Sequence, residues 1–196
     1  MILVVIAMQE EAELIVKHPL SDVKIILTGV GKVNAASKLT EAILTHKVDK
    51  ILNLGFAGAS GDFHIGDIVY VKRAMYHDFD LTLFGYEKGQ VPGYPSYFMT
   101  DEAWGFHLEQ YPFKSSDLYT GDYFATEHYN QNCLYDMEGT ALFQVAHRFN
   151  IPILSIKVVS DLIGSASHFE SYRRFEASEG AKRLFEIYQH ILGGIV

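Results

Sequence analysis

Ile2-Leu3-Val4-Val5-Ile6-Ala7 stands at the start of the chain and is followed at once by Met8-Gln9-Glu10-Glu11. A short run that is apolar at every position, rather than at alternate positions, is typical of a strand buried on both faces of a sheet. Similar runs rich in Val and Ile recur at residues 24–27, 51–54, 68–71 and 153–159. Helical patterns lie between them. The sequence therefore predicts an α/β fold, with helices on both faces of a largely parallel sheet.

Three segments carry apolar residues at helical spacing, namely residues 32–45, 139–149 and 170–192. The apolar face of the first is expected to hold Val33, Ala36, Leu39 and Ile43. That of the last is expected to hold Tyr172, Leu184, Tyr188 and Ile191. Residues 77–96 form a long irregular region rich in Gly, Pro and aromatic residues, which is typical of a functional or partner-covered loop. No linker interrupts the chain, so we expect a single domain over residues 1–196.

Composition excludes several classes of protein. The 196 residues are 48 % hydrophobic, with 13 Phe, 12 Tyr and one Trp, which is incompatible with a disordered chain. The net charge of −8 argues against a nucleic-acid partner, because such a partner needs clustered Lys and Arg. Residues 2–7 are too short to span a membrane and lack the flanks of a signal peptide. With Cys133 as the single cysteine, we expect a soluble, cytoplasmic protein.

The turn Gly29-Val30-Gly31-Lys32 resembles a phosphate-binding loop only superficially. No Gly stands at the required upstream position, Val33 replaces the magnesium-binding Ser or Thr, and Asn34 replaces the third Gly of the dinucleotide fingerprint. A tight strand-to-helix turn is the favoured interpretation.

Motifs for a serine nucleophile or a zinc site are absent as well, because the sequence has neither Gly-x-Ser-x-Gly nor His-Glu-x-x-His. We expect His77 and His128 to be surface or supporting residues rather than metal ligands.

Acidic residues follow several predicted strands. Glu10 and Glu11 come after the first strand, Glu138 follows Tyr135-Asp136-Met137, and Asp161 follows the run 153–159. Ligands of α/β sheets bind beyond the carboxyl ends of the strands, where such acids can share acid–base work. Acids at strand ends also cap the helices that follow. Position alone leaves these two interpretations open.

Nine sequence segments together suggest a family. They are AMQEE (7–11), GVGKV (29–33), GFAG (55–58), GDIV (66–69), YHD (76–78), FGYEKGQVPG (84–93), GDYF (121–124), DMEG (136–139) and VSD (159–161). In this order, and over the whole chain, they resemble the 5′-methylthioadenosine/S-adenosylhomocysteine nucleosidases. These enzymes belong to the purine nucleoside phosphorylase/uridine phosphorylase superfamily.

The resemblance implies a three-layer αβα sandwich around a central twisted mixed sheet. Family members usually carry a strand hairpin after the first helix, whereas here only residues 18–22 separate that helix from the next strand. We therefore expect a fold that lacks one N-terminal hairpin. Two further departures are Lys157 in place of a common Arg, and Phe56 in place of a small or polar residue. The bulk of Phe56 is expected to narrow the nucleophile pocket beside Ala57 and Gly58.

The resemblance also implies hydrolysis of an N-glycosidic bond, giving adenine and a 5′-thioribose product. By similarity, Asp161 is the general acid at adenine N7, and Ser160 orients it. Such an acid must keep its proton near neutral pH, so burial is expected to raise its pKa. Glu11 is implied as the base that activates water, and Glu138 as the acid that binds the ribose hydroxyls. Met137 is implied to line the sugar. Because water and carboxyl groups suffice for this chemistry, the resemblance implies no metal and no organic cofactor.

The remaining site residues are implied by the same resemblance. Phe124 stacks on the purine, and the backbone of Ala125 reads the adenine edge. The apolar 5′-thioalkyl pocket is implied to consist of Met8, Phe84, Tyr86 and Pro92. In the family the last three come from a neighbouring subunit, so a homodimer is expected, in which the loop 84–92 completes the partner's site.

Three alternatives remain at this stage. A purine nucleoside phosphorylase is disfavoured because Phe56 offers no hydrogen-bond donor and no Arg occurs in residues 1–71. A hydrolase of a related, futalosine-type nucleoside would use the same acids. A non-catalytic nucleoside-binding module would have no need of an acid at N7.

Overall fold

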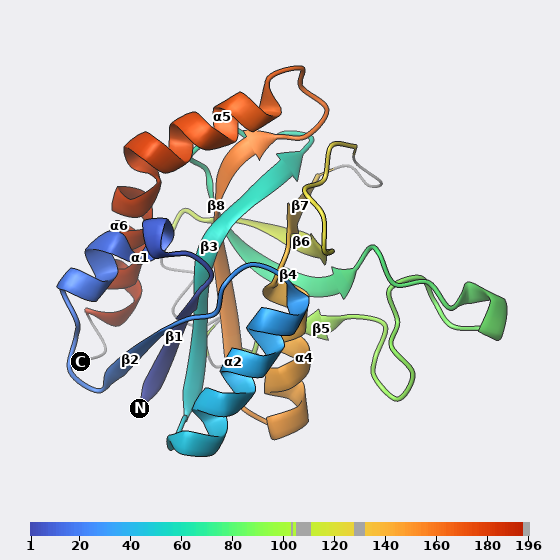
Figure 1. Ribbon diagram of the computed structural model, residues 1–196, viewed down its shortest axis with the longest axis horizontal. Helices are drawn as coiled ribbons and strands as arrows, with labels where there is room; N and C mark the ends of the chain where they lie inside the picture. The colour runs from blue at the N-terminus through green and yellow to red at the C-terminus, as the bar shows by residue number, and fades with distance from the viewer. Residues whose placement is uncertain (103, 105–110, 128–131, 194–196) are drawn as a thin grey trace.

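The computed structural model describes residues 1–102, 104, 111–127 and 132–193; His128 lies outside them (Figure 1). The strands are β1 (Ile2–Ile6), β2 (Val23–Leu27), β3 (Lys50–Ser60), β4 (Ile68–Tyr76), β5 (Phe98–Met99), β6 (Lys114–Thr120), β7 (Cys133–Asp136) and β8 (Ile153–Leu162). The α-helices are α1 (Gln9–Lys17), α2 (Lys32–Thr45), α4 (Gly139–Phe149), α5 (His168–Phe175) and α6 (Ala181–Leu192). A 3-10 turn (Thr82–Phe84) and a π-helical turn (Glu176–Gly180) complete the described elements.

The eight strands form one mixed sheet. β2, β1, β3 and β8 are joined by parallel pairings, as are β4, β6 and β7. Antiparallel pairings join β3 to β7, β4 to β8 and β4 to β5. Because β3 pairs with both β8 and β7, the strands β3, β8, β4, β6 and β7 close into a ring. The sheet is therefore mixed, as the family resemblance implies, and less parallel than the apolar runs alone suggest.

Helices cover both faces of the sheet, so the molecule has three layers (Figure 1). In β1, Leu3 and Val5 belong to the apolar cluster beneath α2 and α4, while Val4 and Ile6 belong to the cluster beneath α1 and α6. All four side chains are completely buried. This two-sided burial explains why the strand is apolar at every position. The predicted α/β architecture is confirmed.

Two predictions about the helices are wrong in detail. Val33 is 77 % exposed, because the buried face of α2 is formed by Ala35, Leu39 and Ala42. Val33 precedes Ala35 by two positions, which places it about 200° away around the helix axis. The predicted helix 170–192 is divided by the π-helical turn, since α5 packs on β8 beside the strand ends and α6 packs on α1.

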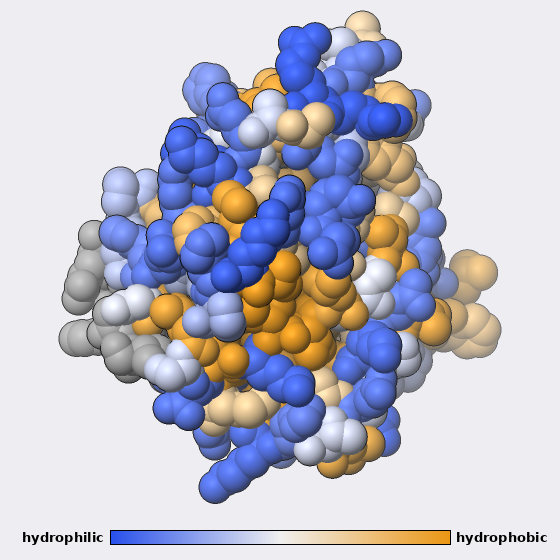
Figure 2. Space-filling model, turned by 60° about the vertical axis from the view of Figure 1, so that its left-hand side comes forward, coloured by the Kyte–Doolittle hydropathy of each residue, from blue (hydrophilic) through white to orange (hydrophobic). Residues whose placement is uncertain are grey.

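The connection between α1 and β2 is short, as predicted for a fold without the usual hairpin. β2 is consequently an edge strand, paired only with β1 among the described strands, and most of its side chains are half-buried. On this side of the molecule an apolar area lies among hydrophilic side chains (Figure 2). Within the described residues, no helix has the length and apolar character needed to cross a membrane.

Candidate active site

Residues from distant parts of the sequence surround one cavity of about 170 Å³ at the ends of β1, β3, β7 and β8. The carboxyl groups of Glu11, Glu138 and Asp161 all line it. Eight more residues predicted from the sequence line it as well: Met8, Phe56, Ala57, Gly58, Phe124, Ala125, Met137 and Ser160. The cavity thus brings together, within one chain, eleven of the fourteen predicted site residues.

Glu11 is a buried carboxyl group held by backbone donors. It lies in the first turn of α1, where Met8 N donates to Oε2 at 3.0 Å, and Phe56 N donates to Oε1 at 2.8 Å. Glu11 both caps α1 through the bond from Met8 and lines the cavity. At this residue, capping a helix therefore does not exclude a place in the site. Burial raises the pKa of Glu11, while the hydrogen bond from Phe56, the charge of Lys157 and the hydrogen bond from Met8 oppose the shift.

Glu138 is the N-cap residue of α4, but its side chain makes no capping hydrogen bond. Its Oε1 accepts a hydrogen bond of 2.8 Å from the backbone N–H of Gly31. Gly31, with φ of 97°, belongs to the predicted tight turn between β2 and α2. The turn therefore offers its N–H to a carboxylate of the protein. Burial and the neighbouring charge of Asp136 raise the pKa of Glu138 to about 7.

A buried ion pair lies behind these acids. Lys157 Nζ is 2.8 Å from Asp136 Oδ2, and both side chains are 2 % exposed. Burial by itself would lower the pKa of Lys157, but the charges of Asp136, Glu138 and Glu11 outweigh it and raise that pKa. Lys157 therefore remains protonated and balances part of the negative charge of the site. Asp136 also lines the cavity, and the sequence singles it out only as part of DMEG.

Asp161 owes its position to an irregularity in β8. The pairing with β3 runs from Ala57–Val159 directly to Gly58–Asp161, which leaves Ser160 as an extra residue. Such a bulge redirects the following side chain. Ser160 Oγ donates to Asp161 Oδ1 at 2.7 Å and has the Ala57 carbonyl oxygen at 3.2 Å. Burial raises the pKa of Asp161, and the hydrogen bond from Ser160 only partly opposes this rise.

An aromatic wall borders the cavity on the side of α5. The Phe124 ring stacks on His168, with centroids 5.3 Å apart and planes inclined by 11°. Phe169 and Tyr172 meet the Phe124 ring edge-on at 6.1 and 5.8 Å. Both line the cavity, although helical spacing alone placed Tyr172 on a core-facing side of its helix. Five further residues line the cavity and were not predicted, because nothing in their side chains or spacing indicates a catalytic role: Ala7, Val30, Tyr123, Tyr135 and Ile163.

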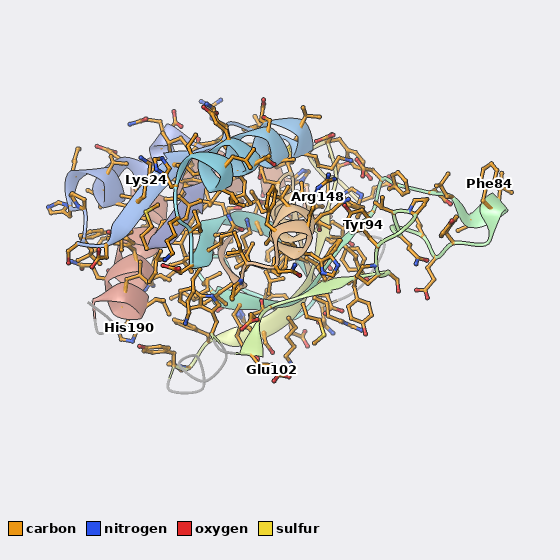
Figure 3. All side chains as sticks on the ribbon, turned by 90° about the horizontal axis from the view of Figure 1, so that it is seen from below. Lys24, Phe84, Tyr94, Glu102, Arg148 and His190 are labelled. Atoms are coloured by element: carbon orange, nitrogen blue, oxygen red, sulfur yellow. The ribbon has the colours of Figure 1, made fainter. Side chains whose placement is uncertain are left out.

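Phe84, Tyr86 and Pro92 do not line the cavity of their own chain. They belong to the loop between β4 and β5, which extends away from the body of the protein with Phe84 near its tip (Figure 3). Phe84 is 77 % exposed and its neighbour Leu83 is 97 % exposed. Among the described residues, no group of three or more His, Cys, Asp and Glu side chains is arranged to hold a metal ion.

Comparison with known proteins identifies the family. The family model of the phosphorylase superfamily matches residues 21–192. The 5′-methylthioadenosine/S-adenosylhomocysteine nucleosidase of Buchnera aphidicola subsp. Schizaphis graminum is 38 % identical over 76 % of this chain and 71 % of its own. That of Hydrogenovibrio crunogenus is 32 % identical over 87 % of this chain and 82 % of its own.

A solved structure is similar over the whole chain. It is the S-adenosylhomocysteine nucleosidase of Streptococcus pyogenes, in complex with 5-methylthiotubericidin. It superimposes with a TM-score of 0.89 at 26 % identity, covering 100 % of this chain and 97 % of its own. Because the sequence relatives exceed 30 % identity over most of both chains, the chain belongs to the 5′-methylthioadenosine/S-adenosylhomocysteine nucleosidase family of the phosphorylase superfamily.

Proposed function

We propose that this protein hydrolyses the N-glycosidic bond of 5′-methylthioadenosine, S-adenosylhomocysteine or both, releasing adenine and a 5′-thioribose product. One observation carries the proposal: Glu11, Glu138 and Asp161 converge on a single cavity, and burial raises the pKa of all three. Carboxyl groups in such surroundings are suited to proton transfer near neutral pH.

Asp161 is proposed to act on the leaving group. In its protonated form it gives its proton to adenine N7 as the C1′–N9 bond breaks, so that neutral adenine leaves in place of an anion. Phe124 stacks on the purine, and the backbone of Ala125 binds its edge. The raised pKa of Asp161 supports this role, because the acid must be protonated before the bond breaks.

Glu11 and Glu138 are proposed to act on the ribosyl half. As C1′ becomes cationic, Glu11 accepts a proton from the attacking water, whose oxygen forms the new bond to C1′. Glu138 binds the ribose hydroxyls, and the negative charge of the site stabilises the developing cation. Met8 and Met137 supply apolar contacts to the sugar and its thioether.

Hydrolysis is favoured over phosphorolysis by the charge of the cavity. Its described lining contains Glu11, Asp136, Glu138 and Asp161 and no Lys or Arg. Lys157 lies behind this lining and is paired with Asp136. A phosphate dianion entering here would remain unpaired among carboxylates, which is strongly unfavourable.

The test is a nucleoside panel in which adenine release is measured with and without phosphate. We expect release from methylthioadenosine or S-adenosylhomocysteine at a rate that phosphate does not change, with a free 5′-thioribose as the second product. A strict requirement for phosphate, with a sugar 1-phosphate as product, would show phosphorolysis. Turnover of a futalosine-type nucleoside alone would show a different substrate.

We also propose that the active form is a homodimer. Phe84 lies near the end of the extended loop between β4 and β5 and does not line the cavity of its own chain (Figure 3). Its exposed apolar tip is suited to the 5′-thioalkyl pocket of a second copy. We propose a cytoplasmic location, which is supported by the single buried thiol of Cys133.

A further inference from the structure

The π-helical turn between α5 and α6 lies against a residue of the active site. Gly180, the last residue of this turn, is buried, and its φ of −56° and ψ of −54° are ordinary helical values. Any residue adopts this conformation, so the backbone does not require glycine here. Turns of this kind are frequent at functional sites.

The absence of a side chain at Gly180 is explained by the Phe56 ring, which fills the space next to it. A β-carbon at Gly180 would lie 2.9 Å from Cε1 and 3.0 Å from Cε2 of Phe56 and would overlap the end of that ring. On another side the Phe56 ring meets Phe175 edge-on, with centroids 5.4 Å apart. Phe56 is 7 % exposed and belongs to the apolar cluster beneath α1 and α6. The far end of its ring is therefore held between Phe175 and Gly180.

The other end of Phe56 touches the site. Its backbone N–H donates to Glu11, at 2.8 Å from Oε1, and the residue lines the cavity. Glu11 and Lys157 both lie close to Gly55, the preceding residue, where a β-carbon would be 3.0 Å from Glu11 Oε1 and 3.4 Å from Lys157 Nζ. A displacement of this short segment would move the donor to Glu11 and bring the ring into the cavity.

We propose that Gly180 is a positioning residue, which makes room for the Phe56 ring in the helical layer and so keeps Phe56 N–H on Glu11 and the cavity open beside it. This inference rests on the proposed hydrolysis, in which Glu11 activates water. It also bears on the expectation that the bulk of Phe56 narrows the nucleophile pocket. The far end of the ring lies at Gly180, on the side of Phe56 away from Glu11, and not in the pocket.

The test is Gly180→Ala, with Glu179→Ala as the matched control, because Glu179 is an exposed residue of the same turn. We expect kcat to fall by at least about tenfold, in keeping with the cost of small displacements at a catalytic group. The fall of kcat on the acidic side of its pH profile should move to higher pH, since the Phe56 hydrogen bond lowers the pKa of Glu11. Glu179→Ala should match the wild type.

A double-mutant cycle identifies the cause. Phe56→Leu keeps the backbone N–H and removes the ring atoms that overlap, so Gly180→Ala should have little effect on kcat in the Phe56→Leu background. Equal losses in both backgrounds would overturn the proposal. Phe175→Leu loosens the ring without creating an overlap. Phe175→Leu should lower kcat a few-fold and move the acidic side of the pH profile to higher pH, as Gly180→Ala does. A wild-type kcat and pH profile in that variant would also contradict the proposal.

A ¹³C NMR titration of Glu11 separates this inference from the proposed function, because it needs no turnover. In Gly180→Ala the pKa of Glu11 should rise relative to the wild type. A wild-type protein that releases no adenine, together with a raised Glu11 pKa in the variant, would refute only the nucleosidase activity. An active wild type with an unchanged Glu11 titration in Gly180→Ala would refute the positioning role.

Discussion

Asp161 carries the most specific chemical expectation at the level of single residues. Asp161→Asn keeps the size of the side chain but cannot protonate N7, so kcat should fall by about 10²- to 10⁴-fold. Binding of a non-hydrolysable adenine-nucleoside analogue, measured by calorimetry, should change little. In the wild type, kcat should fall as pH rises through the raised pKa of Asp161, because the acid form is the active one. Near-normal turnover of Asp161→Asn would exclude this role.

This residue could be located from the sequence, and the family resemblance implied its burial and the role of Ser160, but the pairing that produces both could not be read from the sequence. Asp161 was found from its place after an apolar run and from the VSD segment. That it is 2 % exposed, with Ser160 as its donor, follows from strand pairing and not from local sequence. Tyr172, by contrast, was not recognised as a site residue. Its helical spacing suggests a core residue, whereas the arrangement of α5 places it at the cavity.

At the level of elements, the bulge in β8 brings Ser160 to Asp161 and so partly offsets the rise in the pKa of this acid that burial causes. Ser160→Ala removes the hydroxyl that donates to Asp161 Oδ1, and this hydrogen bond lowers the pKa of Asp161. Its loss should raise that pKa further. Because the protonated form is active, the decline of kcat at alkaline pH should move to higher pH. A pH–rate profile of Ser160→Ala against the wild type checks this, and a shift to lower pH would contradict it.

Two helices were predicted correctly from sequence patterns. The ends of α2 and α4 agree with the predicted segments 32–45 and 139–149, because Gly precedes or opens each helix and the apolar spacing is regular. The π-helical turn was not predicted. Residues 170–192 keep a helical pattern throughout, and the division of the helix depends on the separate surfaces that α5 and α6 must cover.

At the level of the whole molecule, the proposed dimer predicts complementation between two defective subunits. Phe84→Ser alone should raise KM by about tenfold or more through the lost apolar contact, and Asp161→Asn alone should be almost inactive. A heterodimer of the two, purified through different tags, contains one site with an intact Asp161 and an intact Phe84 from its partner. It should recover about half of the wild-type kcat/KM.

The result that excludes this arrangement is equally clear. If Phe84 served the cavity of its own chain, no site in the heterodimer would be intact, and kcat/KM would stay at the level of Phe84→Ser or below. Sedimentation of the wild type as a monomer at assay concentration, with full activity, would also contradict the dimer.

The sequence by itself determined the α/β class, most strands and helices and the shortened connection after α1, and its family motifs indicated the three acids that line the cavity. Hydrophobic periodicity and short motifs are local properties, so one chain without coordinates is sufficient to read them. Tertiary structure decided what depends on pairing and packing between distant segments. It closed β3, β8, β4, β6 and β7 into a ring, placed Lys157 on Asp136 and fitted Phe56 against Gly180. Burial and electrostatic contact arise only when remote residues meet, and they set the pKa values on which the proposed chemistry depends.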